Sequence, residues 1–167
     1  MTYRVTVSAR FEAAHNLVDY EGGPEPLHGH SYKVEAVLAA EKLQRYDVAV
    51  DFVPAKKALE AIAKELDYSY INEHPAFQGR NTSAENLALH FAERLEASGA
   101  LGWAKVAEVT VWEGPENRAT WRMSKGLSLE QHGPSPPLLL SPSAGCGRAS
   151  ACGRGWPLAR PRRARRH

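Results

Sequence analysis

The chain has 167 residues, of which 43% are hydrophobic, and this is enough for one domain with a packed core. Its 21 Lys and Arg nearly balance its 19 Asp and Glu, and no apolar run approaches the roughly 18 residues that cross a membrane. These features argue against a membrane-spanning protein. The N-terminus begins directly with a strand pattern and shows no secretion signal, so we expect a cytoplasmic protein.

The composition changes at about residue 123. Residues 124–167 hold eight of the Lys and Arg, one acidic residue and both cysteines, and they show almost no hydrophobic period. We predict one folded domain over 1–123 and a disordered basic tail over 124–167. The arginine-rich end could attract phosphate. We favour the interpretation that the tail is extra sequence past a natural end, and we do not expect a nucleic-acid partner.

Two strands are predicted at the start of the chain. From Tyr3 to His15, apolar and polar residues alternate, which is typical of a half-buried antiparallel strand. The segment 27–39 is rich in aromatic and β-branched residues and predicts a second strand. The glycines and prolines of residues 16–26 indicate a wide hairpin connection between the two strands.

Two helices and two further strands follow. Residues 51–67 and 82–99 carry apolar residues at helical spacing, and the second helix opens with a Thr82-x-x-Glu85 capping box and stops at Gly99. Strands are predicted from Val106 to Glu113 and, after a turn, through Trp121. The order β-β-α-α-β-β predicts an α+β domain, with two helices packed on one face of an antiparallel sheet.

Three histidines in the first hairpin form a candidate metal site. His28 and His30 are two residues apart on one predicted strand, so they point to the same face, and the hairpin can bring His15 beside them. Three nitrogen ligands without a fourth protein ligand suit a catalytic Zn²⁺, which keeps one position open. The alternative is a set of ordinary surface or hydrogen-bonded strand histidines.

Glu113 ends an otherwise apolar stripe on its strand. A partly buried carboxylate needs hydrogen-bond donors, and a ligand with adjacent N–H groups, such as the edge of a guanidine-like heterocycle, would supply two. The pattern by itself favours the other interpretation, in which Glu113 reaches solvent or pairs with Arg118 or Arg122.

Six segments over about residues 3–122 together resemble the 6-pyruvoyltetrahydropterin synthase and 6-carboxytetrahydropterin synthase family, in matching order: FEAAH, LHGHSYKVE, VDFVPAK, LDYSYIN, NTSAENLA and VTVWEGPENRATW. The resemblance implies a tunnelling fold, in which four-stranded antiparallel sheets join into trimeric barrels that stack as a hexamer with active sites between subunits. It also implies that His15, His28 and His30 bind zinc. The same resemblance implies that Glu113 anchors the amino-pyrimidine edge of a pterin substrate, with Ser83 in the same pocket.

The chain departs from the family pattern at two catalytic positions. Where most members carry a cysteine base this chain has Pro24, but Glu25 resembles a branch in which glutamate replaces that cysteine. Asp67 is kept, whereas the usual histidine after it is Tyr68. A tyrosine, with a reference pKa of about 10, could donate a proton but is a poor base at neutral pH. His74 could take its place, and a third possibility is that Tyr68 only packs.

The leading functional prediction is a zinc-dependent carbon–oxygen or carbon–carbon lyase that acts on the side chain of 7,8-dihydroneopterin triphosphate. Glu25 favours the product 6-hydroxymethyl-7,8-dihydropterin, a folate precursor. One alternative is a 6-carboxytetrahydropterin synthase for queuosine-type deazapurines, and another is a pterin-binding protein that has lost catalysis. An RNA-associated protein that uses the basic tail is a further, weaker alternative.

Overall fold

A computed structural model describes residues 2–124 of the chain. The tail predicted over 124–167 lies outside these residues, apart from its first position. Along the chain, the strands and helices are β1 (Tyr3–His15), β2 (His28–Ala40), α1 (Phe52–Leu66), β3 (Ser69–Tyr70), α2 (Ala84–Ala97), β4 (Lys105–Glu113) and β5 (Asn117–Arg122), with short 3₁₀ turns at Arg45–Asp47, Ile71–Glu73 and Pro75–Phe77. The predicted α+β class and the order of the long elements are confirmed.

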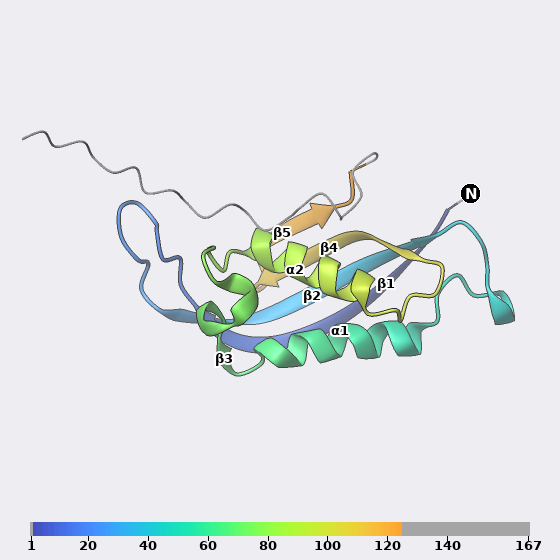
Figure 1. Ribbon diagram of the computed structural model, residues 1–167, viewed down its shortest axis with the longest axis horizontal. Helices are drawn as coiled ribbons and strands as arrows, with labels where there is room; N and C mark the ends of the chain where they lie inside the picture. Colours follow the sequence, from blue (N-terminus) through green and yellow to red (C-terminus); the bar gives the residue numbers. More distant parts are fainter. Residues whose placement is uncertain (1, 125–167) are drawn as a thin grey trace, which may run out of the picture. The chain divides into compact units, whose positions relative to one another are not determined.

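The sheet has five strands, in the order β3-β1-β2-β4-β5, rather than the predicted four (Figure 1). The four long strands pair antiparallel as expected, and the extra strand β3 pairs in parallel with β1 over two residues. A strand of two residues is too short to show a hydrophobic period, so the sequence pattern could not reveal it. Its position makes β3 one edge of the sheet and β5 the other.

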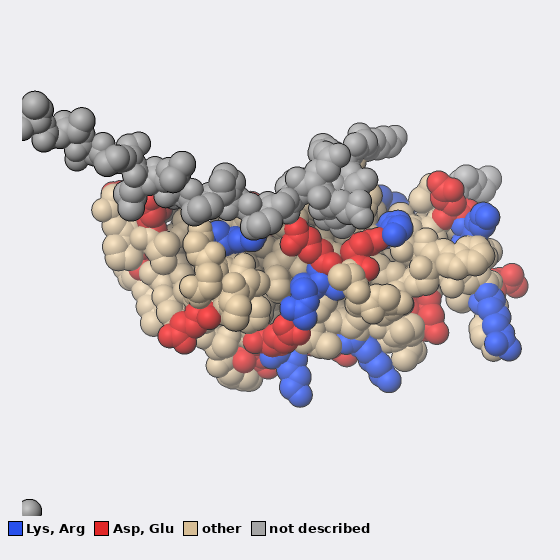
Figure 2. All heavy atoms as spheres, in the orientation of Figure 1, with Lys and Arg blue, Asp and Glu red and all other residues tan. Residues whose placement is uncertain are grey.

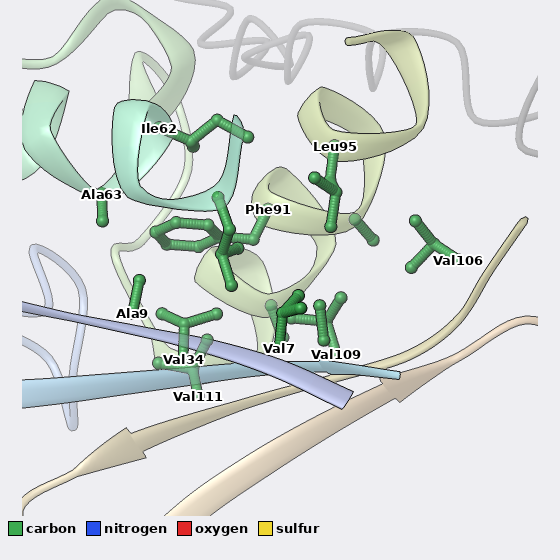
Figure 3. Close-up of a cluster of buried hydrophobic side chains, with 14 of the residues drawn as sticks. Val7, Ala9, Val34, Ile62, Ala63, Phe91, Leu95, Val106, Val109 and Val111 are labelled. Carbon is green, nitrogen blue, oxygen red and sulfur yellow. The ribbon is translucent and has the colours of Figure 1, made fainter. Parts of the chain in front are cut away.

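Helices α1 and α2 pack on one face of the sheet (Figure 3). Ile62 from α1 and Phe91 from α2 enter the layer between the helices and the strands, where they meet a set of valines that includes Val34 (Figure 3). The buried residues alternate along β1 and β2, as the period-two pattern predicted. This apolar layer fixes which residues of each strand face the helices.

The start of α2 differs from the predicted capping box. Ser83 is the N-cap, and its side chain accepts from the Asn86 N–H, whereas Thr82 is fully buried and bonds elsewhere. The predicted end of the helix is close to the observed one, and Gly99 there has φ +70°, a conformation that side chains with a Cβ rarely adopt.

The helix-free face of the sheet is polar. One row across four strands aligns Arg10, Lys33, Trp112 and Arg118, and the Arg118 guanidinium carbon lies 4.4 Å from the centre of the Trp112 ring. On the side of the molecule shown in Figure 2, acidic and basic side chains are interspersed. In the described part of the chain, neither helix has the length and apolar character needed to cross a membrane.

Candidate metal centre and its cavities

The strand register brings the three histidines together. His15 on β1 is paired directly with His28 on β2, and Ala13 is paired with His30, so all three side chains continue the helix-facing side of the sheet. One ring nitrogen from each histidine lies within 4.8 Å of the others. The predicted cluster is therefore present in the structure.

Backbone carbonyls orient two of these rings. The Nδ1 atoms of His15 and His28 each lie 2.8 Å from a carbonyl oxygen, that of Thr82 and that of Pro26 respectively. A carbonyl oxygen can only accept, so each Nδ1 carries the hydrogen and each Nε2 keeps a free lone pair. Such carbonyl contacts are the usual way to fix the tautomer and direction of a metal-binding imidazole.

The histidine cluster fits a zinc ion on three grounds. The Nε2 atom of His15 is buried and has no hydrogen-bond partner among the described residues, which is costly unless a further group binds it. Nitrogen ligands about 2.0–2.1 Å from a tetrahedral zinc lie roughly 3.4 Å from one another, so the three ring nitrogens, which lie within 4.8 Å of one another, would have to move closer together around the ion. Burial also lowers the pKa of His30, against the opposing effect of Glu113, and so favours the neutral imidazole that a metal requires.

Glu113 lies beside this cluster at the end of β4. Its Oε1 atom is 3.8 Å from Nε2 of His15, and it is buried without a hydrogen-bond partner in the described part of the chain. The interpretation in which Glu113 pairs with an arginine is wrong. Arg122 instead lies 2.8 Å from Glu108, and Arg118 stacks on Trp112. The carboxylate is thus left for a ligand with hydrogen-bond donors.

A cavity of about 290 Å³ joins most of the predicted site residues. It is lined by His15, His28, Glu25, Ser83 and Glu113, together with residues of β5 and the first turn of α2. An Oε atom of Glu25 accepts from the Leu17 N–H at 3.2 Å, which holds this carboxylate beside the start of the hairpin loop. Two of the three histidines therefore share one cavity with three carboxylates, those of Glu25, Glu113 and Glu85 of α2.

Asp67 and Tyr68 lie elsewhere. Asp67 accepts from the Glu12 N–H at 2.9 Å and does not line the cavity of Glu113. Tyr68 is 86% exposed, so it does not pack into the core of its own subunit. It lines a second cavity, of about 510 Å³, in which His30 also takes part. The histidine cluster thus borders two cavities, and Tyr68 belongs to the one without Glu113.

His74 does not line either of these cavities. Its Nδ1 accepts from the Ala76 N–H, and its Nε2 lies 3.9 Å from Glu65, on the side of the fold where α1 and α2 meet. Within one chain, His74 therefore does not replace the histidine that the family carries after Asp67.

Sequence reasoning missed a polar network behind the metal cluster. Thr82 supplies the carbonyl that orients His15, and Asn16, Tyr70 and Asn72 connect to it through hydrogen bonds. Asn16 directly follows His15, and this place beside a candidate metal ligand is the sequence signal that could have drawn attention to it; the structure shows that Asn16 is also buried. The partners come from loops more than 50 residues away, which leaves no periodic pattern.

Comparisons with known proteins agree on one family. The family described as 6-pyruvoyl tetrahydropterin synthase matches residues 4–124. Dihydroneopterin monophosphate aldolase of Pyrococcus furiosus is 34% identical over 116 residues, which cover 70% of this chain and 94% of that protein. The 6-carboxy-5,6,7,8-tetrahydropterin synthase of Aquifex aeolicus is 28% identical over 160 residues, covering 73% of this chain and 99% of that protein.

The solved structure of 6-pyruvoyl tetrahydropterin synthase from Caenorhabditis elegans matches with a TM-score of 0.61 at 21% identity, covering 74% of this chain and 97% of that one. This likeness concerns the fold, which is the tunnelling fold that the sequence predicted. With the family match over most of the chain, it leads to one conclusion: the chain belongs to the 6-pyruvoyl tetrahydropterin synthase family.

Proposed function

We propose that the chain is a zinc-dependent lyase that cleaves the side chain of a phosphorylated 7,8-dihydroneopterin to give 6-hydroxymethyl-7,8-dihydropterin. One observation carries this proposal. The Oε1 atom of Glu113 has no hydrogen-bond partner among the described residues, and it lies 3.8 Å from Nε2 of His15 in the same cavity as Glu25. A ring anchor, a metal site and a proton acceptor are thus within reach of one small molecule.

Each of these groups has a distinct task. Glu113 accepts two hydrogen bonds from the amino-pyrimidine edge of the pterin, and His15, His28 and His30 hold the zinc. When bound, zinc acts as a Lewis acid toward oxygens of the substrate side chain. Ser83 lines the same cavity; its oxygen accepts from the Asn86 N–H as the cap of α2, and its O–H can still donate to the substrate.

Glu25 moves the proton in this scheme. Its carboxylate takes the proton of the second side-chain hydroxyl, and the bond between the first and second side-chain carbons breaks with its electron pair drawn toward the pterin ring. The same proton returns to the first carbon, which leaves a hydroxymethyl group and releases a two-carbon aldehyde phosphate. A base of this kind accelerates such steps by about 10²–10⁴-fold.

Two similar proteins support this proposal, one through its reaction type and one through a catalytic glutamate. The Pyrococcus furiosus relative is named an aldolase for dihydroneopterin monophosphate, which is the reaction type proposed here. A solved structure from Plasmodium vivax is described as a mutant in which a glutamate, its catalytic residue, was replaced by alanine. In this chain the cysteine of other members is replaced by Pro24, and Glu25 is the carboxylate that lines the cavity.

A second candidate function is 6-carboxytetrahydropterin synthase, which several relatives are named for, among them the Aquifex aeolicus protein. Members with that activity usually use a cysteine as the base, and this chain has no cysteine before Cys146. The third candidate, a pterin-binding protein without catalysis, keeps the same metal and anchor. These candidates share the cavity and differ in what Glu25 does there.

We also propose that the active unit is a homo-oligomer, with a hexamer as the expected form. The cavity of Glu113 is lined by β5, at one edge of the sheet, and the cavity of Tyr68 by β3, at the other edge. The edge strands of a sheet have unpaired backbone N–H and C=O groups, which are usually covered or paired with another strand. Joining the sheets edge to edge would bring the Tyr68 cavity of one subunit toward the Glu113 cavity of the next.

The test is product analysis by mass spectrometry. The zinc-loaded protein is incubated with the monophosphate and, separately, with the triphosphate of 7,8-dihydroneopterin. The proposal expects 6-hydroxymethyl-7,8-dihydropterin from at least one of them. A carboxy-pterin product would support the second candidate, and unchanged substrate with zinc and pterin both bound would support the binding protein.

A further inference from the structure

We infer that Asn16 is a positioning residue that holds the Glu25 carboxylate in place beside the metal cluster. The inference rests on the proposed function, because it assigns a role toward the group that moves the proton. Asn16 follows His15 directly, is 8% exposed and has every one of its polar groups engaged. It does not itself line the cavity, so it acts through its neighbours.

The backbone of Asn16 is fixed by a reciprocal pair with Asn72. The Asn16 N–H donates to the Asn72 side-chain oxygen at 3.1 Å, and the Asn16 carbonyl accepts from the Asn72 amide at 2.7 Å. The Thr82 hydroxyl lies 3.4 Å from the same carbonyl, and the Thr82 carbonyl orients His15. The backbone of Asn16 therefore belongs to the frame that holds the metal ligand.

The side chain of Asn16 points the other way, toward Glu25. Its Nδ2 donates to the Glu25 carbonyl at 3.1 Å, and its Oδ1 accepts from the Tyr70 hydroxyl at 2.5 Å. The amide orientation is unambiguous, because the Glu25 carbonyl can only accept. Tyr70 thus locks the amide in the rotation that serves Glu25.

Glu25 depends on this stretch for its polar contacts. Its N–H donates to the Leu17 carbonyl at 2.9 Å, its carboxylate accepts from the Leu17 N–H at 3.2 Å, and its carbonyl accepts from Asn16. All three bonds go to the two residues after His15. The distance between the Glu25 carboxylate and the histidine cluster is therefore set by the contacts of Glu25 to Asn16 and Leu17, rather than by the intervening loop of residues 18–24.

The substitution Asn16→Asp tests the side-chain contact with nearly unchanged size. It keeps the acceptor for Tyr70 but replaces the donor to Glu25 by an oxygen, so the Glu25 carbonyl loses its partner. The matched control is Asn86→Asp, because the Asn86 amide also donates to a loop carbonyl, that of Asn81 at 2.9 Å, and Asn86 lines neither cavity. Tyr70→Phe is a milder second variant, which removes only the Tyr70 hydroxyl that donates to the Asn16 amide oxygen.

Four readouts are combined on the full chain: amide hydrogen exchange, kcat, KM and zinc affinity. In the metal-free protein, Asn16→Asp should speed amide hydrogen exchange at Leu17 and Glu25 by about tenfold, the equivalent of one lost hydrogen bond. In the zinc-loaded protein, kcat should fall up to about 100-fold, because small displacements of a catalytic group are that costly. KM and zinc affinity should stay as in the parent, Tyr70→Phe should show a smaller fall in kcat, and Asn86→Asp should change none of these.

The inference is overturned if the Leu17 and Glu25 amides stay as protected in both variants as in the parent, or if zinc affinity falls as steeply as kcat. Glu25→Gln measured in parallel separates it from the proposed function. If Glu25→Gln turns over normally, the assigned role of Glu25 fails. If Glu25→Gln is inactive while Asn16→Asp and Tyr70→Phe are fully active, only the positioning role fails.

Discussion

The two cavities that meet at the histidine cluster are built in different ways. The first takes His15, His28 and Glu113 from long, central strands and holds Glu25 through backbone hydrogen bonds. The second takes Tyr68 from the short connection at the sheet edge, where its side chain is exposed and its backbone has φ +51°. One chain therefore brings together the residues that we propose to bind metal and ring, whereas Tyr68 lies exposed at the edge of the sheet.

The strongest test of the first cavity is loss of a metal ligand. His28→Ala should weaken zinc binding by more than the roughly 10–100-fold typical of second-sphere changes, and it should abolish product formation. Zinc affinity is measured by competition with a chelator. His74→Ala is the matched control, since His74 lines neither cavity, and equal zinc loss in both variants would show that the cluster is not the metal site.

Glu25→Gln should give the next largest effect. Removing the proton acceptor should lower kcat by about 10²–10⁴-fold while zinc and pterin still bind. The control is Glu21→Gln, in the same loop but outside both cavities. Turnover at the parental rate in Glu25→Gln would show that Glu25 is not the base and would point to the second cavity, where Tyr68 lies.

Glu113→Gln should act on binding rather than on turnover of the bound substrate. Charge-assisted hydrogen bonds contribute about 1.5–3 kcal/mol, so the Kd for neopterin should rise roughly 10–100-fold in a fluorescence titration. Glu108→Gln, a carboxylate on the opposite face of the same strand, should leave the Kd unchanged. An unchanged Kd in Glu113→Gln would show that Glu113 does not bind the pterin ring.

Tyr68→Phe should have the smallest effect, a fall in kcat of about tenfold or less, since Tyr68 contributes one proton-transfer contact from the edge of the sheet. The Tyr68→Phe variant is most informative in mixed oligomers that also contain Glu25→Gln subunits. If sites are shared between subunits, mixed oligomers regain sites with both native residues and exceed the mean activity of the two parents. Activity equal to that mean would show that no site combines Tyr68 of one subunit with Glu25 of another.

The contrast between the cavities also explains what the sequence could reveal. Period-two alternation places His28 and His30 on one face, and it places Glu113 at the end of the apolar stripe of its strand, because side-chain direction follows directly from position in a strand. The cluster and the α+β order were therefore predictable. Glu25 came from a resemblance, and the cavity contact agrees with that role.

The parts that could not be predicted depend on tertiary contacts. Thr82 has the residue type of a helix cap, but its hydroxyl and carbonyl are used by Asn72 and His15, so Ser83 caps the helix instead. The hydrogen bonds of Asn16 join loops that are far apart in sequence. Such contacts depend on which loops the packed sheet brings together, and local propensity does not encode this.

The most direct test of this account is anomalous X-ray diffraction at the zinc edge from crystals of the zinc-loaded protein with neopterin bound. The account predicts an anomalous peak bonded to one nitrogen each of His15, His28 and His30, with the pterin ring on Glu113 and its side chain between the metal and Glu25. A metal bound elsewhere, or a pterin ring that does not contact Glu113, would contradict it.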